Sequence, residues 1–336
     1  MRRKGFVRRY RIAIVSVEND LHALAIHKAL AQQADAECRI IESNRVCGSA
    51  TVNWSNGKKD LECTILAKGG EEIAVHDLDI IWWRRVGLRQ EIPSNVTDPV
   101  HIDVINNECA VALLGILLSE FRGTWINHPL HTQVAQNKLV QLRAAESAGF
   151  RVPHTLVSQD VTAIRRFCER LDYKVVVKPL IGTQRAPLFT TMATPDHLAC
   201  EDSVALCPAM YQEFIPGVRH IRAQCFGDAV YSVVIESEDL DWRADLDVPF
   251  TVFDLAEDVK ARLQKVLKLL QLKMGIVDLK FAQDGAPVWF EINPQGQFLF
   301  VEGLSGLDLT SAFADFLYRE ARQASKSAPM EMRGLF

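Results

Sequence analysis

The chain has 336 residues, of which 48% are hydrophobic and 24% charged, and its formal net charge is −4. This length exceeds the usual size of one core and predicts two or three subdomains. The slightly acidic balance argues against a nucleic-acid binder, and no apolar run reaches the roughly 20 residues of a membrane span. Eight scattered cysteines form no Cys-x-x-Cys pair, and we see no secretion signal. We therefore expect a cytoplasmic protein with reduced thiols, and a solvated basic run at residues 1–11.

The first third of the chain predicts an α/β subdomain, residues 1–123, with an open parallel sheet. Its strands, helices and inserted hairpin follow one another at residues 11–17 (strand), 20–33 (helix), 37–43 (strand), 50–67 (hairpin around Asn56-Gly57), 78–87 (strand) and 99–121 (helix). The tandem Trp82-Trp83 is typical of a strand end with one core and one surface ring, and less so of a stacking platform.

A central subdomain, residues 124–208, follows a short strand that Pro129 ends. The pattern predicts a helix at 132–148 ended by Gly149, a strand at 154–158, a helix at 161–171 and a strand at 173–180. A hairpin-like stretch near Phe189 and a short helix capped near Thr194 complete it.

A C-terminal subdomain, residues 209–325, precedes a tail at residues 326–336. We expect a strand at 209–215, a hairpin turning at Gly227-Asp228, a helix at 255–272, a second hairpin at 275–297 and a last helix from 307.

The second hairpin carries two carboxylates on otherwise apolar strands. If Asp284-Gly285 forms its turn, facing residues have numbers that sum to 569, and Asp278 lies opposite Glu291. Facing like charges are destabilising unless a cation or a proton intervenes. Asn293 shares the strand face of Glu291, so three oxygen ligands converge in a set suited to Mg²⁺ or Mn²⁺. The alternative is a solvated carboxylate pair on an edge hairpin.

Two lysines and one strand end indicate a nucleotide site near this metal. Lys178 ends an apolar strand before Pro179, and Lys138 lies early in a helix, so both could hold phosphate oxygens. Between Lys178 and Asp278 runs "YQEFIPG", whose backbone could read an adenine edge. The residues of this candidate adenine strand are Gln212, Glu213, Phe214 and Ile215.

The order of these parts resembles the ATP-grasp superfamily over roughly residues 124 to 318. The motifs that carry the likeness are "QNKLVQL", "VVVKPL", "YQEFI", "HIRAQCFGD" and "VDLKF…WFEINPQGQ". The resemblance implies an α/β (α+β) fold in which three small parts clamp ATP between two antiparallel sheets.

A narrower likeness rests on "IIWWRRVG", "DWRAD" and "NPQGQFLFVE". These resemble the graspetide ligases, which close macrocycles in ribosomal peptides of the microviridin type. The resemblance implies an ATP-dependent ligase that makes ADP, phosphate and an acyl phosphate of a precursor-peptide side chain, which an amine or hydroxyl then captures. It assigns Arg222 and Arg243 to the acyl phosphate. His220 departs from the pattern, which is commonly acidic there, so Glu213 becomes the carboxylate expected near the nucleoside.

Substrate contacts are predicted at two further places. Arg84 and Arg85 could meet acidic peptide side chains, or form ordinary ion pairs. Asp196, Glu201 and Asp202 lie in a stretch longer than nucleotide binding requires, which could grip the leader of the precursor or serve as a lid.

Two other functions stay open: an amino-acid ligase like the glutamate ligases of ribosomal-protein modification and lysine biosynthesis, and a non-catalytic ATP-binding regulator. We expect neither nucleic acid nor membrane as a partner, and two copies of the chain could form a homodimer.

Overall fold

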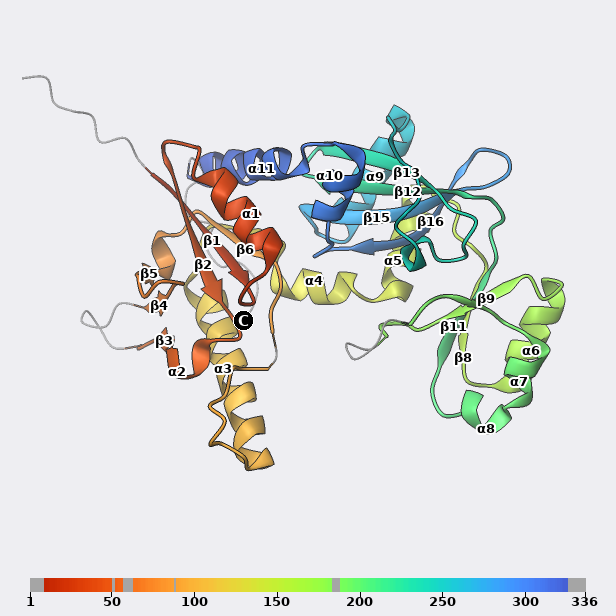
Figure 1. The fold of residues 1–336 in the computed structure, drawn as a ribbon, viewed down its shortest axis with the longest axis horizontal. Helices are drawn as coiled ribbons and strands as arrows, with labels where there is room; N and C mark the ends of the chain where they lie inside the picture. The colour runs from red at the N-terminus through yellow and green to blue at the C-terminus, as the bar shows by residue number, and fades with distance from the viewer. Residues whose placement is uncertain (1–8, 50–51, 57–62, 88, 183–187, 326–336) are drawn as a thin grey trace, which may run out of the picture. The chain divides into compact units, whose positions relative to one another are not determined.

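The computed structural model describes residues 9–49, 52–56, 63–87, 89–182 and 188–325 (Figure 1). It divides into two compact units, one of Met1–Pro129 with Asp308–Phe336 and one of Leu130–Leu307. The last helix therefore groups with the first unit, whereas the sequence placed residues 209–325 together. The basic residues 1–8, the Gly57 side of the predicted turn and the tail 326–336 lie outside the described residues.

The first unit is built on a parallel sheet in the order β2-β1-β6-β7, as the α/β pattern predicted. Its strands are β1 (Tyr10–Ser16), β2 (Ala36–Glu42), β6 (Ile80–Trp83) and β7 (Thr124–Ile126). In Figure 1, α1 (Leu21–Leu30) and α11 (Leu309–Ala324) lie side by side on one face, and α3 (Pro99–Glu120) lies on the other. The inserted hairpin is part of a small antiparallel sheet, with α2 and a 3₁₀ turn beside it: α2 (Val46–Ser49), β3 (Val52–Asn53), β4 (Thr64–Leu66), β5 (Glu72–Ala74) and η1 (Val75–Asp77).

The two tryptophans at the end of β6 are both buried, which corrects the expectation that one would be a surface ring. Successive strand residues point to opposite faces, and here both faces are covered by helices. Trp82 packs edge-on against Phe313 of α11, and Trp83 packs against Trp125 in the cluster under α3.

Helix α3 is long and apolar enough to cross a membrane by length and composition alone, with a mean hydropathy of 1.6 over 18 residues of which 17% are buried. Its C-terminal half packs on the sheet through Leu113, Ile116 and Leu117. Val100, Val104 and Val111 are exposed on the rest of the helix.

The second unit begins with two helices where the sequence predicted one. The first, α4 (Pro129–Ala135), is followed by α5 (Lys138–Ala148). Asn137 caps α5, and its side chain accepts a hydrogen bond from the Leu139 amide. An Asn at this position caps a new helix in place of continuing the old one. The break makes Lys138 the first residue of α5, and Gly149 ends that helix with a φ of +96°.

Two antiparallel sheets make up the rest of this unit. The central sheet, in the order β10-β9-β11-β8, contains β8 (Thr155–Ser158), β9 (Val175–Lys178), β10 (Thr191–Met192) and β11 (Ala209–Glu213). Its helices are α6 (Val161–Arg170), α7 (Pro195–Ala199) and α8 (Glu201–Val204).

The larger sheet, in the order β14-β13-β12-β15-β16, is covered on one face by α5 and α9 (Glu257–Leu269), and the apolar stripe of α9 is buried there. Its strands are β12 (Arg219–Phe226), β13 (Ala229–Glu236), β14 (Phe250–Val252), β15 (Met274–Phe281) and β16 (Pro287–Asn293). A 3₁₀ turn, η2 (Trp242–Ala244), and a short helix, α10 (Leu299–Ser305), were not predicted.

Candidate functional site

The carboxylates of the β15–β16 hairpin face each other as predicted, but the turn is longer than predicted and the strand register changes once. The turn has three residues, 283–285, because the Ala282 amide bonds the Ala286 carbonyl at 3.0 Å and Gly285 takes a φ of +77°. Near the turn, facing numbers therefore sum to 568, as for Leu279 and Trp289. A bulge at Phe290 absorbs the extra residue and restores the sum of 569, so Asp278 pairs with Glu291.

The bulge also changes which side chains share a face. Neighbouring residues of a regular strand point to opposite faces, yet the side chains of Phe290 and Glu291 both lie near Lys178. The Phe290 ring centroid lies 5.4 Å from Lys178 Nζ, a cation–π contact at the end of β9.

Each of the two facing carboxylates is neutralised by a cation from another element. Arg222 Nη1 donates to both oxygens of Asp278, at 2.9 and 3.0 Å, and Lys138 Nζ lies 2.9 Å from Glu291 Oε2. Burial raises the pKa of Asp278 against the effect of Arg222. Burial acts in the same direction on Glu291, but Lys138 and Lys178 outweigh it and lower its pKa to about 2. The repulsion expected from the sequence is thus offset within the protein.

Arg222 is fixed on several sides and is 7% exposed. Beyond Asp278, its Nη2 donates to the Gln297 carbonyl at 3.0 Å, and its guanidinium lies over the rings of Trp242 and Phe300 at 5.6 and 5.3 Å. It does not line the cavity described below. Among the predicted site residues, its direct partner is Asp278.

Strand β16 is an edge strand, and a buried side chain of α5 satisfies its outer backbone groups. Gln141 Oε1 accepts from the Ile292 amide at 3.0 Å, and Gln141 Nε2 donates to the Ile292 carbonyl at 2.8 Å. The same Nε2 donates to the Ala135 carbonyl at 2.7 Å. Because Ile292 separates Glu291 from Asn293, Gln141 fixes the stretch of strand that presents both.

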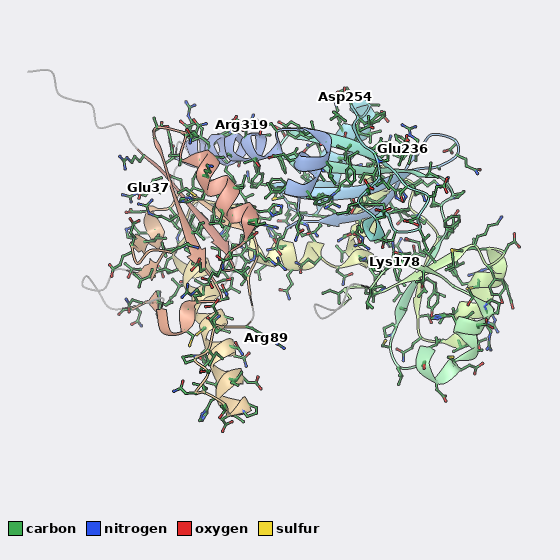
Figure 2. All side chains as sticks on the ribbon, viewed as in Figure 1. Glu37, Arg89, Lys178, Glu236, Asp254 and Arg319 are labelled. Carbon is green, nitrogen blue, oxygen red and sulfur yellow. The ribbon has the colours of Figure 1, made fainter. Side chains whose placement is uncertain are left out.

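The two antiparallel sheets of this unit border a cavity of about 1010 Å³. Lys178, which Figure 2 labels at the end of β9, faces it, and burial together with the Lys138 ammonium lowers the pKa of Lys178 to about 8. Of the predicted site residues, the structure brings ten together around this cavity: Lys138, Lys178, Gln212, Glu213, Phe214, Ile215, Arg243, Asp278, Glu291 and Asn293.

The predicted adenine strand is tied to its neighbours at its end. Gln212 Nε2 donates to Thr155 Oγ1 at 2.9 Å, and the Glu213 carboxylate accepts from the His154 amide at 3.1 Å. Glu213 also forms an ion pair with Arg151 at 3.4 Å. These bonds fix the backbone that would meet a base edge.

His220 and Lys280 face each other across β12 and β15 and form the cavity wall beside Phe214. Both are buried, His220 Nε2 makes no hydrogen bond to the described residues, and the Lys280 ammonium lies 5.6 Å from the Phe214 centroid. Burial, with Lys280 nearby, lowers the pKa of His220 to about 4, so the imidazole is neutral at physiological pH.

Five predicted substrate residues lie elsewhere. Arg84 belongs to the first unit, where it is buried and its Nε lies 3.3 Å from Asp20 Oδ2, so the ion-pair alternative holds for it; Arg85, beside it, is exposed. Asp196 on α7 and Glu201 and Asp202 on α8 are exposed and do not line the cavity. Glu201 pairs with Arg165 at 2.6 Å.

Sequence reasoning missed three residues of the site. Lys280 could have been found from its spacing, since it shares the strand face of Asp278 two residues earlier. Asp241 was visible only as part of "DWRAD", and Gln141 only as part of "QNKLVQL". Asp241 bonds Thr190, 51 residues away, and Gln141 bonds Ile292, 151 residues away. No local pattern reports such contacts.

The donor set fits a hard divalent cation. Two facing carboxylates and the side-chain oxygen of Asn293, which also accepts from the Gln295 amide at 3.0 Å, are oxygen ligands of the kind Mg²⁺ takes beside phosphates. Among the described residues no three His, Cys, Asp or Glu side chains gather into a metal cluster, so this set depends on the amide and on ligand oxygens. Two protein cations, Lys138 and Arg222, already contact these carboxylates, so the pair is stabilised by positive charge.

Two antiparallel sheets that enclose a large cavity, with an acidic hairpin on one side and a strand ending in lysine on the other, define the ATP-grasp fold. Solved structures of that fold superpose over nearly the whole chain. The macrocyclase MdnC of Microcystis aeruginosa MRC, crystallised with the precursor peptide MdnA, gives a TM-score of 0.82 at 22% identity, covering 92% of this chain and 99% of that one.

Two further structures agree. A RiPP-associated ATP-grasp ligase of Chryseobacterium gregarium, in complex with ADP and a leader and core peptide, gives a TM-score of 0.82 at 20% identity over 97% of this chain and 100% of that one. The ATP-grasp ligase PsnB, complexed with a precursor variant, Mg and ADP, gives 0.75 at 20% identity over 93% and 99%. No family model and no curated protein matches the sequence.

Proposed function

We propose that this chain is an ATP-dependent ligase that activates side-chain carboxylates of a ribosomal precursor peptide and closes amide or ester macrocycles. The observation that carries the proposal is the convergence of Asp278 and Glu291 with Lys138, Lys178 and Arg243 around one cavity. The three cations would neutralise part of a polyphosphate, the two carboxylates would hold a metal ion against it, and the cavity leaves room for a second reactant. The structural neighbours bound to precursor peptides support the choice of substrate class.

The proposed reaction has two steps. An oxygen of the substrate carboxylate bonds to the γ-phosphorus of ATP while the bond to the β-phosphate breaks, which gives an acyl phosphate and ADP. A substrate hydroxyl or amine then attacks the acyl carbon and loses its proton, and phosphate leaves. The protein's task is alignment and charge neutralisation in a water-poor site.

The residues divide this task by position. Lys138 and Lys178 would hold phosphate oxygens, and residues 212–215 would hold the base. Arg243, whose side chain is half exposed at the cavity, would contact the acyl phosphate. Arg222, which the sequence assigned to the same role, would act on the reaction through Asp278.

Asp278, Glu291 and Asn293 would hold Mg²⁺, with Mn²⁺ as a substitute. Bound there, the ion would supply charge neutralisation of the β- and γ-phosphates. To admit it, Glu291 must share or release Lys138, and Asp278 must share or release Arg222. The chain's own cations would then be available to the nucleotide and substrate.

His220 and Lys280 would take the ribose side of the nucleotide site. A neutral imidazole with a free ring nitrogen can accept from a ribose hydroxyl or donate to its oxygen, and the Lys280 ammonium can donate beside it. Glu213 is already occupied by the His154 amide and Arg151, so it would contact a nucleoside with its remaining lone pairs.

The leader of the precursor would lie along α7 and α8, where Asp196, Glu201 and Asp202 present exposed carboxylates. A clamp of this kind would raise the effective concentration of the core peptide at the cavity. The double variant Glu201→Ala with Asp202→Ala should then bind a fluorescent precursor more weakly and keep its basal ATP hydrolysis. Altered turnover with unchanged peptide binding would indicate a lid instead.

The proposal as a whole is tested by searching beside the gene for a short reading frame rich in Asp/Glu and Thr/Ser/Lys and by offering its peptide to the protein. With Mg·ATP, mass spectrometry should show the loss of one water per ring and equal amounts of ADP. Ligation of free glutamate without any peptide reaction would favour the amino-acid ligase, and nucleotide binding without turnover the regulator. We place the reaction in the cytoplasm, where ATP is available.

A further inference from the structure

Asp241 is a buried carboxylate at the cavity wall to which neither the sequence nor the proposed function gives a role. It precedes η2 and accepts hydrogen bonds from two segments. Its Oδ1 binds the Arg243 amide at 3.3 Å and Arg243 Nε at 2.7 Å, and its Oδ2 binds Arg243 Nη2 at 2.6 Å. The Thr190 amide donates to Oδ2 at 3.3 Å.

The contact between the two side chains is bidentate and fixes the plane of the guanidinium. It uses the Nε–H and one Nη2–H of Arg243. Both Nη1–H groups and the second Nη2–H point away from Asp241 and remain for a ligand. Because Arg243 lines the cavity and half of its side chain is exposed, these three donors are available to an anion there.

The backbone that carries the pair is anchored independently. Trp242, between the two residues, is 7% exposed and stacks on Phe300 at 6.1 Å with an interplanar angle of 27°. The Thr190 amide ties Asp241 to the segment 188–190, whose Leu188 and Phe189 also line the cavity. The carboxylate is therefore held in place by groups other than Arg243 itself.

We propose that Asp241 is a positioning residue: it holds the Arg243 guanidinium in one orientation so that its free N–H groups face the transferred phosphoryl group. The inference rests on the proposed function and adds a residue to it. An arginine on a flexible side chain would otherwise sample many orientations, and alignment in the transition state governs kcat more than the binding of ATP.

The test is a double-mutant cycle on ADP formation with precursor peptide, using Asp241→Asn, Arg243→Met and the double variant. Asn cannot accept from both Arg243 nitrogens, so we expect kcat to fall about 10- to 100-fold with KM for ATP within about threefold of wild type. If Asp241 acts through Arg243, the double variant is no slower than Arg243→Met. Effects that multiply, or a wild-type rate for Asp241→Asn, overturn the proposal.

Two variants separate positioning from folding. Asp241→Ser keeps a hydroxyl that can cap η2 but lacks the bidentate contact, so it should show the same kcat loss with an unchanged Tm. Asp245→Asn, at the other end of η2, removes the same charge and should ligate at the wild-type rate. A full rate in Asp241→Ser would also refute the assignment.

Failure of the proposed function gives a different result. If the wild type binds ATP but ligates no peptide, the same cycle is measured by calorimetry on ATP affinity, where Asp241→Asn should again add nothing to Arg243→Met. Additive losses of affinity would then overturn the positioning role alone. A wild-type chain that binds no ATP would overturn both.

Discussion

Because Lys138 is paired with Glu291, removal of the lysine should strengthen the binding of a divalent metal ion and weaken the binding of ATP. The atoms are 2.9 Å apart, and the side chains are 21% and 27% exposed. At an effective dielectric constant of about 20, their attraction is about 6 kcal/mol. Lost hydration and side-chain freedom reduce the net value to about 1–2 kcal/mol. A metal ion that binds Glu291 in the absence of nucleotide must overcome this pairing.

Lys138→Met should therefore bind a divalent ion more tightly when no nucleotide is present, by about tenfold for about 1.4 kcal/mol. The same variant should bind ATP about 10- to 100-fold more weakly, because it loses a charged donor to phosphate. Electron paramagnetic resonance of free Mn²⁺ measures the first constant, and calorimetry with ATP the second.

Lys268→Met, an exposed lysine on α9, is the matched control and should change neither constant. If Lys138→Met weakens Mn²⁺ binding, or leaves it unchanged, the lysine does not compete with the metal for Glu291. The reasoning about internal neutralisation would then be wrong, whatever happens to ATP.

Three further results are expected. Asp278→Asn should abolish Mg·ATP turnover and lower the free energy of unfolding by about 3 kcal/mol in urea, since Arg222 would stay buried without its carboxylate. ATP affinity by calorimetry should fall as the pH rises through about 8, where Lys178 loses its proton, and Lys178→Arg should flatten that fall. Gln141→Met should cost about 2–4 kcal/mol in urea, because it leaves both backbone groups of Ile292 unsatisfied.

The first two of these have a clear contrary outcome. Asp278→Asn that is as stable as wild type would mean that Arg222 finds other partners. A flat pH profile in the wild type would mean that Lys178 has the same protonation state in the free and the nucleotide-bound protein over that range, and the reasoning from its lowered pKa would be wrong. For stability itself the sign is reversed: the pKa of Lys178 is depressed on folding, so the unfolded chain binds more protons between about pH 8 and the ordinary lysine value, and the free energy of unfolding should rise across that window.

The sequence predicted the elements of the second unit well because their signals are local. Gly149, Thr194 and Asp284-Gly285 mark ends and turns through their own backbone preferences. The missed break at Asn137 is of the same kind and was readable, since Asn caps helices. The helix α10 lacks a polar cap at Phe298, and nothing in its seven residues distinguishes it from a loop.

The sequence predicted most residues that line the cavity, but it did not predict which of them form ion pairs with each other. The lysines were assigned to phosphate oxygens, the arginines to the acyl phosphate and the carboxylates to a metal, whereas the structure pairs Lys138 with Glu291 and Arg222 with Asp278. Such pairs join segments 56 and 153 residues apart, and they depend on how the elements pack. The facing of Asp278 and Glu291 was predicted from a two-residue turn, and it holds because a longer turn and a bulge cancel.

That cancellation makes the surface turn a determinant of the cavity. A hairpin shortened by one residue at 283–285 could pair Leu279 with Phe290 directly and would need no bulge. Glu291 would keep its partner, but the Phe290 ring beside Lys178 would turn to the other face of the sheet, and Trp289 would turn to the face of Lys280. A deletion at residues 283–285, in solvent and five to seven residues before Phe290, can thus rearrange the aromatic side chains of the cavity wall without replacing a single charged group. Changes in the length of this turn, during evolution or in laboratory selection, could therefore alter the shape of the pocket around Lys178.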